Sequence, residues 1–170
     1  MQIRDATARD AAAIAAIYND AVEHTTATWH TATVDAADRE IWMATRQAAR
    51  FPVLVADDGD EIVGYATYGD WRAWEGYRFT VEHSVYVRAD QRGRGLGRTL
   101  MERLIAHARD AGKHVMVAGI EAQNTGSIAL HGRFGFTEVG RMPQVGAKFG
   151  RWLDLVFLQL VLDERAEPGD

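Results

Sequence analysis

A glycine-rich segment between two regular runs is the feature that most constrains how this chain can fold. Residues 91–98 read Gln-Arg-Gly-Arg-Gly-Leu-Gly-Arg, and they join an alternating run, Thr80–Arg88, to an apolar-periodic run, Leu96–Ala108. Glycine lacks the Cβ atom that would keep a ligand away from the backbone, so consecutive N–H groups can turn toward one anion at the start of a helix. The sequence therefore predicts a strand, an anion-binding loop and a helix, in that order.

Spacing separates this loop from two common phosphate-binding motifs. A Walker loop requires a lysine and then a hydroxyl residue after its last glycine, whereas Arg98 follows Gly97 here. A dinucleotide fingerprint requires Gly-x-Gly-x-x-Gly and an acidic residue about 20 positions later, but the glycines are spaced by two and Val117 stands near that place. Both interpretations lose support. A simple glycine turn with solvated arginines stays open at this point.

Composition limits the class of protein. The 170 residues are 47% hydrophobic, include no cysteine and carry a formal net charge of -5. Disulfides, thiolate metal sites and a cysteine nucleophile are therefore excluded, and broad nucleic-acid binding is disfavoured. No apolar run approaches the ~20 residues of a membrane span, and the first residues lack the apolar segment of a secretory signal, so we expect a cytoplasmic protein. Positive charge gathers around the glycines, which suits one small polyanion; the residues are Arg88, Arg92, Arg94, Arg98 and Arg103.

Periodicity predicts regular elements in an alternating order. We expect strands at Gln2–Arg4, Val53–Ala56, Glu61–Tyr68, Arg78–Arg88, Val115–Ile120 and Leu153–Leu162, and helices at residues 7–23, 35–50, 96–111 and 127–134. Thr7–Asp10 resembles a capping box with aspartate in place of glutamate, and Asp57–Asp60 is typical of a hairpin turn. The order predicts one α/β domain over residues 1–162, with helices on a single sheet, and then a frayed acidic tail, residues 163–170.

Further motifs follow the loop in a recognisable order. They are the loop pattern Gln/Arg-x-x-Gly-x-Gly/Ala, Glu-His-Ser-Val-Tyr-Val at 82–87, Asn-Thr-Gly-Ser-Ile-Ala-Leu-His at 124–131, and Gly135-Phe136. With these motifs the chain resembles the GCN5-related N-acetyltransferase superfamily over nearly its whole length. Residues 76–87 and 150–157 are similar to the subgroup that acetylates phosphinothricin, methionine sulfone or methionine sulfoximine. The resemblance implies the acetyltransferase fold, a single mixed and mostly antiparallel sheet flanked by helices.

The resemblance also implies a reaction, transfer of an acetyl group from acetyl-CoA to the primary amine of a small amino-acid-like substrate. The amine must lose a proton to become nucleophilic, and the leaving thiolate benefits from a proton donor. Glu82 is the candidate base, since it shares a strand face with Ser84 and Tyr86 just upstream of the cofactor strand. An ordinary ion-paired glutamate is the alternative. Two other functions remain open, acetylation of a protein amine and non-catalytic binding of an acyl-CoA.

The expected coenzyme A contacts rest on the same resemblance. Val85, Tyr86 and Val87 would present the cofactor strand to the acetyl and pantetheine arm, while Asn124 and Ser127 would lie beside pantetheine. The diphosphate would be surrounded by the loop residues Arg92, Gly93, Arg94, Gly95, Leu96, Gly97 and Arg98, whose arginines add charge. An asparagine in a loop is also a common turn former, so the role of Asn124 stays open.

His131 stands where many members of the superfamily have a tyrosine that protonates the coenzyme thiolate. Imidazole can donate a proton near neutral pH, but a helix histidine can also simply pack, and the sequence leaves both roles open for this second catalytic candidate. The other histidines are His24, His30, His83, His107 and His114. They do not show the spacing of zinc ligands, so we expect no metal.

An aromatic and cationic cluster precedes the candidate catalytic strand and is the expected substrate site. It comprises Arg72, Trp74, Glu75, Gly76, Tyr77 and Arg78, next to Trp71. Arg72 or Arg78 could grip the carboxylate of an amino-acid substrate with paired hydrogen bonds, or could stack on the neighbouring rings. By family analogy, we expect Trp29 and Phe149 to close the pocket across the interface of a homodimer.

Overall fold

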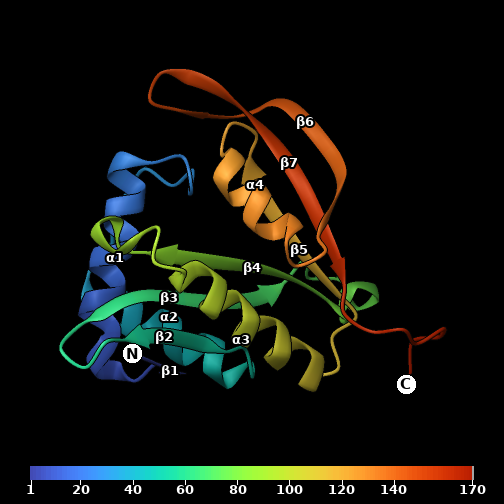
Figure 1. Cartoon of the computed structure of the whole chain (residues 1–170), viewed down its shortest axis with the longest axis horizontal. Helices are drawn as coiled ribbons and strands as arrows, with labels where there is room; N and C mark the ends of the chain where they lie inside the picture. Colours follow the sequence, from blue (N-terminus) through green and yellow to red (C-terminus); the bar gives the residue numbers. More distant parts are fainter. Residues whose placement is uncertain (170) are drawn as a thin grey trace.

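A single seven-stranded sheet organises the chain in the computed structural model, which describes residues 1–169 (Figure 1). The strands are β1 Gln2–Asp5, β2 Val53–Asp57, β3 Ile62–Asp70, β4 Thr80–Val87, β5 Val115–Glu121, β6 Thr137–Lys148 and β7 Arg151–Val161, in the order β1-β2-β3-β4-β5-β7-β6. Within the described residues, neighbouring strands pair antiparallel except β4 and β5, which are parallel. The expected mixed, mostly antiparallel sheet is confirmed.

Helices cover both faces of the sheet, as Figure 1 shows. They are α1 Ala11–His24, α2 Ala36–Ala48, α3 Leu96–Asp110 and α4 Thr125–Gly132, with short 3-10 turns at 8–10, 75–77 and 89–91. Strand β2 shows why two layers form. Val53 and Val55 pack with α1 and α2, whereas Leu54 and Ala56 pack with α3. Because successive strand side chains point to opposite faces, a continuous apolar run needs cover on both sides.

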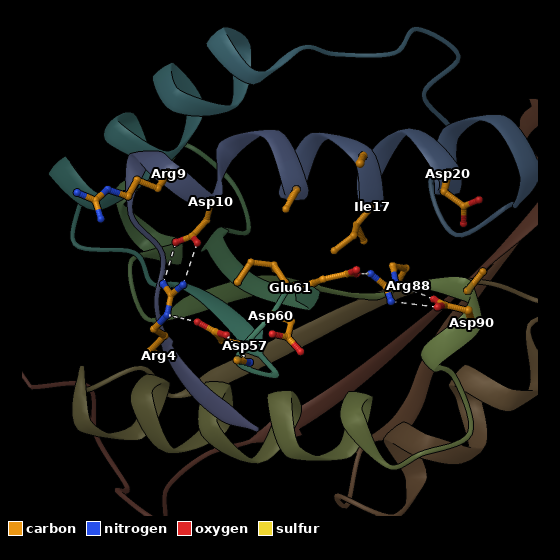
Figure 2. A pocket seen from close by; sticks show the side chains of 15 residues that line it. Arg4, Arg9, Asp10, Ile17, Asp20, Asp57, Asp60, Glu61, Arg88 and Asp90 are labelled. Carbon is orange, nitrogen blue, oxygen red and sulfur yellow. Dashed lines mark hydrogen bonds and ion pairs between the residues drawn. The ribbon is translucent and has the colours of Figure 1, made fainter.

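The start of α1 is tied to the sheet by one carboxylate. Asp10 accepts a hydrogen bond from the backbone N–H of Thr7 at 2.7 Å, which confirms the expected capping box. It also accepts two hydrogen bonds from Arg4 on β1, at 2.8 and 2.9 Å, and Arg4 in turn binds Asp57 on β2 (Figure 2). The hydrogen bonds from Arg4 lower the pKa of the Asp10 carboxyl to about 2, against the opposing effect of burial.

Replacing Asp10 should cost stability in a pH-dependent way. The folded pKa of Asp10 lies below the unfolded pKa of ~3.9, so the charged carboxylate stabilises the fold above about pH 4 and loses this effect as the pH falls toward 2. We expect Asp10→Asn to lower the free energy of unfolding by about 2 kcal/mol at pH 7, with a smaller difference at pH 3. Urea unfolding at the two pH values measures this. Asp90→Asn, which removes an exposed ion pair with Arg88, is the control and should change little. An equal loss at both pH values would contradict the prediction.

One strand was missing from the sequence prediction. The sequence indicates six strands and leaves residues 137–150 unassigned, whereas β6 fills most of that stretch and pairs with β7. Its alternation is obscured because most of the strand is exposed, because Pro143 interrupts it, and because the register shifts twice. Phe149 and Gly150 both have positive φ and form the tight turn into β7.

The helix boundaries were predicted closely, except at the fourth helix. Asp35 caps α2 through a hydrogen bond from the Asp38 N–H, as expected. The helix expected at 127–134 instead begins at Thr125 and ends at Gly132. Because Asn124 accepts the Ser127 N–H, the first turn already includes Thr125 and Gly126. Gly135 has φ +87, in agreement with the expected left-handed position. None of the described helices is long and apolar enough to cross a membrane.

The segment expected to be an acidic tail is anchored at its beginning. Asp163 Oδ1 lies 2.7 Å from Nδ1 of His114, and the Arg165 guanidinium donates to Gly112 O at 2.7 Å. Arg165 also lies over the ring of Phe79. Asp170 lies outside the described residues.

Candidate active site

The site begins where two parallel strands separate. Strands β4 and β5 pair only over Thr80–Glu82 and Val115–Val117, although β4 continues to Val87 and β5 to Glu121. Beyond this point their facing backbone groups have no strand partner, and backbone N–H and C=O groups need one. A cleft of about 870 Å³ opens here. An extended ligand with amide groups could therefore complete the hydrogen bonding of both strands.

The glycine loop lies at the mouth of this cleft. Gly93 and Gly95 have φ of +77 and +83, and Gly95 is the N-cap of α3. A Cβ atom on either glycine would meet nothing within 4 Å, so the space in front of the loop is open. Backbone N–H groups at a helix N-terminus attract anions, and the left-handed conformation turns them toward a common point. The local geometry fits a diphosphate.

The cleft contains nearly all of the predicted cofactor residues. It is lined by Val85, Tyr86, Val87, Arg92, Gly93, Gly95, Leu96, Gly97, Arg98, Asn124 and Ser127, together with His131 and others. Arg94 is not among the lining residues and donates instead to the side chain of Gln91. Asn124 caps α4 through its side-chain oxygen, as a turn former would, and it also lines the cleft, so its expected contact with pantetheine stays a prediction.

Charge distinguishes this cleft from a second cavity of about 710 Å³, which is lined by α1, the β2–β3 turn and residues 88–90. Figure 2 shows that cavity lined by six carboxylates and three arginines: Asp10, Asp20, Asp57, Asp60, Glu61 and Asp90 against Arg4, Arg9 and Arg88. Arg4 and Arg88 are already ion-paired there. The first cleft is lined by Arg92, Arg98 and Arg133, and no carboxylate lines it within the described residues. A polyanion is therefore attracted to the first cleft and repelled by the second.

Glu82 lies on the opposite sheet face from its neighbour His83, as the strand alternation predicts. Its carboxylate points over Gly119 on β5, where an added Cβ would lie 3.1 Å from Glu82 Oε1. No hydrogen-bond or ion-pair partner of Glu82 is found among residues 1–169, so the ion-paired alternative loses support. Burial raises the pKa of the Glu82 carboxyl, and the charge of Arg72 partly opposes this. A free carboxylate with a raised pKa is a better proton acceptor near neutral pH.

The predicted substrate cluster is divided by the structure. Arg72 interacts electrostatically with Glu82 and lies 4.4 Å from the centroid of Trp71, which packs edge-on against Phe157 of β7. Arg78 instead lies over the ring of Phe79. Trp74, Glu75, Gly76 and Tyr77 are exposed and none of them lines either cavity. Only Arg72 in this cluster is brought near the candidate base.

His131 is buried on the cleft wall, opposite the sheet face that carries Glu82. Its Nδ1 lies 2.7 Å from Ser127 O, and its Nε2 lies 2.9 Å from Nε2 of His83. Burial lowers the pKa of the His131 imidazole. The His131 ring therefore lines the cleft, and it is held by hydrogen bonds in addition to packing.

Several site residues were not found by sequence reasoning. The loop after α1, assigned no clear structure, contributes Thr25, Thr26 and Ala27 to the cleft. The loop is held by Lys148 Nζ, which is buried and donates to the carbonyls of Thr25 and Thr28 at 2.6 and 2.7 Å. Neither Lys148 nor the loop after α1 has a local sequence signal of this role, because the contact joins residues more than a hundred positions apart. Gly119 did have one, since a glycine inside an apolar strand often marks a close approach.

Trp29 packs against the β6–β7 hairpin of its own chain, and its expected place at a homodimer interface stays a prediction. Its ring covers Gly146 of β6 in the same chain, so closely that a Cβ on Gly146 would overlap the ring. Trp29 therefore fastens the loop after α1 to the β6–β7 hairpin. Phe149 lies at the tip of that hairpin and is 57% exposed.

Comparison with known proteins agrees with the geometry. The chain is 60% identical over 162 residues to the L-methionine sulfoximine/L-methionine sulfone acetyltransferase of Pseudomonas aeruginosa, and the match covers 95% of this chain and 94% of the relative. It is 37% identical over 155 residues to the phosphinothricin N-acetyltransferase of Alcaligenes faecalis, and the match covers 91% of this chain and 79% of the relative. The structure of yncA from Salmonella typhimurium with its cofactor acetyl-CoA has a TM-score of 0.96 at 56% identity (99% and 97% covered). The structure of a ribosomal-protein-alanine N-acetyltransferase from Brucella melitensis has a TM-score of 0.93 at 52% identity, with 95% of this chain and 99% of that chain covered. A model of the acetyltransferase (GNAT) family matches residues 14–136. On these findings the chain belongs to the acetyltransferase (GNAT) family.

Proposed function

We propose that this enzyme transfers the acetyl group of acetyl-CoA to the α-amine of a small amino acid of the methionine sulfone, methionine sulfoximine or phosphinothricin type. One observation carries the proposal. The Glu82 carboxylate, which has no hydrogen-bond partner in the described part of the chain, and the Arg72 guanidinium lie near each other beside the gap between β4 and β5. An α-amino acid has its amine and its carboxylate two bonds apart, so one small molecule can present the first to Glu82 and the second to Arg72.

Each part of the site has one task in this reaction. The glycine loop with Arg92 and Arg98 would hold the diphosphate, and the open edge of Val85–Val87 would hold the extended arm. Glu82, directly or through water, would take the proton of the attacking amine, and His131, which lines the cleft, would supply the proton that the thiolate requires. Metal ligands are not needed for any of these tasks.

An acceptor panel tests the proposal. Purified enzyme is mixed with acetyl-CoA and single amines, and release of free thiol is followed. We expect release with methionine sulfone, methionine sulfoximine or phosphinothricin, and none with the corresponding N-acetyl compounds. Activity with another small amine would keep the reaction and change the substrate. Thiol release with none of the amines, from folded protein that binds acetyl-CoA, would instead favour the non-catalytic acyl-CoA module.

A protein amine is the second candidate acceptor, favoured by the likeness to the Brucella protein described above. A peptide with an N-terminal alanine carries the same α-amine, but its carboxyl group is part of an amide. The Arg72 guanidinium would then have no carboxylate to bind. Including such a peptide in the panel separates the two acceptors, since the small-molecule enzyme should acetylate free amino acids much faster than the peptide.

Arg72 gives a direct test of the amino-acid acceptor. We expect Arg72→Gln to raise KM for the amino acid about 10-fold to 100-fold, because a charge-assisted hydrogen bond contributes about 1.5–3 kcal/mol, while KM for acetyl-CoA stays unchanged. Arg78→Gln is the matched control and should have a small effect, since Arg78 lies over Phe79. A larger effect at Arg78 than at Arg72 would reverse the assignment.

A homodimer is proposed on the surface of the β6–β7 hairpin. β6 is an edge strand, and this hairpin exposes Val139, Met142, Val145, Phe149 and Trp152. Clustered exposed apolar side chains favour association with a second copy. Sedimentation velocity should give the mass of a dimer, and Trp152→Glu should shift it toward the monomer; a monomeric parent protein would end the proposal.

A further inference from the structure

Two buried histidines face each other at the wall of the cleft. His83 Nε2 and His131 Nε2 lie 2.9 Å apart, and the side chains are 8% and 6% exposed. His83 Nδ1 lies 2.9 Å from Val117 O, and His131 Nδ1 lies 2.7 Å from Ser127 O. These three contacts each need one hydrogen, whereas two neutral imidazoles carry one hydrogen each. One contact in the neutral pair is therefore left without a hydrogen.

The groups next to the two Nδ1 atoms decide which contact lacks a hydrogen. Val117 O and Ser127 O can both only accept, so a bare Nδ1 is tolerated only where another group donates to it. Among the described residues no other group bonds His83 Nδ1, so this nitrogen carries the hydrogen and His83 Nε2 is an acceptor. His131 must then donate from Nε2, which leaves its own Nδ1 bare. Ser127 Oγ lies 3.4 Å from this Nδ1 and can donate to it. The opposite arrangement would leave a bare His83 Nδ1 against a carbonyl oxygen, with no hydroxyl to relieve it.

One added proton satisfies all three contacts. With a hydrogen on His131 Nδ1, the ring donates to Ser127 O at 2.7 Å, a distance typical of a charge-assisted hydrogen bond. Burial opposes the charge, and it lowers the pKa of His83 to about 3 and that of His131 as well. The charged side chains that line the cleft beside the pair are Arg92 and Arg98 from the loop and α3, and Arg133 after α4. A bound polyanion would neutralise these arginines and so favour the protonated ring.

We infer that His83 is a positioning residue that sets the tautomer of His131, so that His131 Nδ1 is the atom that gains and releases a proton at the cleft. The inference rests on the proposed acetyl transfer. When the new C–N bond forms and the C–S bond breaks, the electron pair of the C–S bond stays on sulfur. The proton from His131 Nδ1 then passes to that sulfur, and the proton of the amine passes to Glu82. Exchange with water restores both residues.

The tautomer can be measured without any substrate. Nitrogen NMR of the protein labelled with 15N-histidine distinguishes ring nitrogens that carry a hydrogen from those that do not. Above the titration of the pair, we expect hydrogen on His83 Nδ1 and His131 Nε2, and a bare His131 Nδ1 that becomes protonated as the pH falls. Hydrogen on His131 Nδ1 with a bare Nε2 at high pH would overturn the inference. This result does not depend on whether the protein transfers acetyl groups, so the two failures are distinguishable.

Two substitutions of His83 test its positioning role in catalysis. In His83→Gln the amide can donate to Val117 O and accept from His131 Nε2, so the tautomer is kept and kcat should fall less than about threefold. In His83→Phe the acceptor is lost, and we expect kcat to fall about tenfold or more with KM for acetyl-CoA unchanged. His107→Phe removes another imidazole, hydrogen-bonded to Tyr68 at 2.8 Å away from the cleft, and should keep full kcat. Equal losses in the Gln and Phe variants, both folded, would also overturn the inference.

Discussion

Glu82→Gln should lower kcat about 100-fold to 10,000-fold, which is the range expected when a general base is removed. The substitution keeps the shape of the side chain over Gly119 but removes its ability to take a proton. Affinity for acetyl-CoA, measured by calorimetry, should change less than twofold, because Glu82 does not line the coenzyme cleft. The pH profile gives a second measurement. Burial raises the pKa of Glu82, and the base acts when deprotonated, so kcat/KM of the parent enzyme should fall as the pH drops through this raised value.

The matched control for Glu82 is Glu138→Gln. Glu138 is also a strand glutamate, but it is exposed and ion-paired with Arg141 at 3.1 Å. Its replacement should leave kcat unchanged. If Glu82→Gln retained parental turnover and the same acidic limb of the pH profile, Glu82 would not be the base, although the cleft and its coenzyme affinity would stand.

Gly95→Ala should weaken acetyl-CoA binding about 10-fold to 100-fold, which corresponds to about 1.4–2.8 kcal/mol. Gly95 has φ +83 and its missing Cβ leaves open space in front of the N-terminus of α3. An added methyl group would stand where the diphosphate approaches the backbone N–H groups, and the left-handed conformation would itself be strained by about 1–2 kcal/mol. Calorimetric titration with coenzyme A measures the affinity.

Gly112→Ala separates the strain from the lost contact. Gly112 lies at the other end of α3 with φ +70, and a Cβ there would also meet nothing within 4 Å. Both alanine variants should melt at similarly reduced temperatures, but only Gly95→Ala should lose coenzyme affinity. If both variants bound coenzyme A equally well, the loop would be no more than a turn between β4 and α3.

Local features of the fold were predictable because their causes lie within a few residues. The capping box Thr7–Asp10 before α1, the capping of α2 by Asp35, the hairpin at Gly59 and the alternation of β4 each depend on neighbouring side chains and on backbone dihedral preferences. β6 was missed because its cause does not lie within a few residues. Its twelve residues are held by pairing with β7 and not by an apolar pattern of their own, so the sequence carries little local sign of the strand.

The candidate site was only partly predictable. Strand alternation placed Glu82 and His83 on opposite faces, and the glycine loop predicted an anion site at the start of α3. Which of the two arginines lies near Glu82 depends on the packing of elements that are distant in the sequence. Arg72 approaches Glu82 while Arg78 lies over Phe79, and nothing in the spacing of the two arginines distinguishes them. The burial of Lys148 under the loop after α1 is equally non-local.

The sequence by itself determined the glycine-rich loop before α3, the strand that carries Glu82 and the family that these motifs indicate, because each depends on residue types at short, regular spacing. The tertiary structure alone decided that β4 and β5 separate after Glu82, that the carboxylate lies over Gly119, and that His83 meets His131. Hydrogen bonds and contacts of this kind join segments 30 to 50 residues apart. They form only when the order of strands in the sheet brings those segments together, and short-range preferences of the chain do not specify that order.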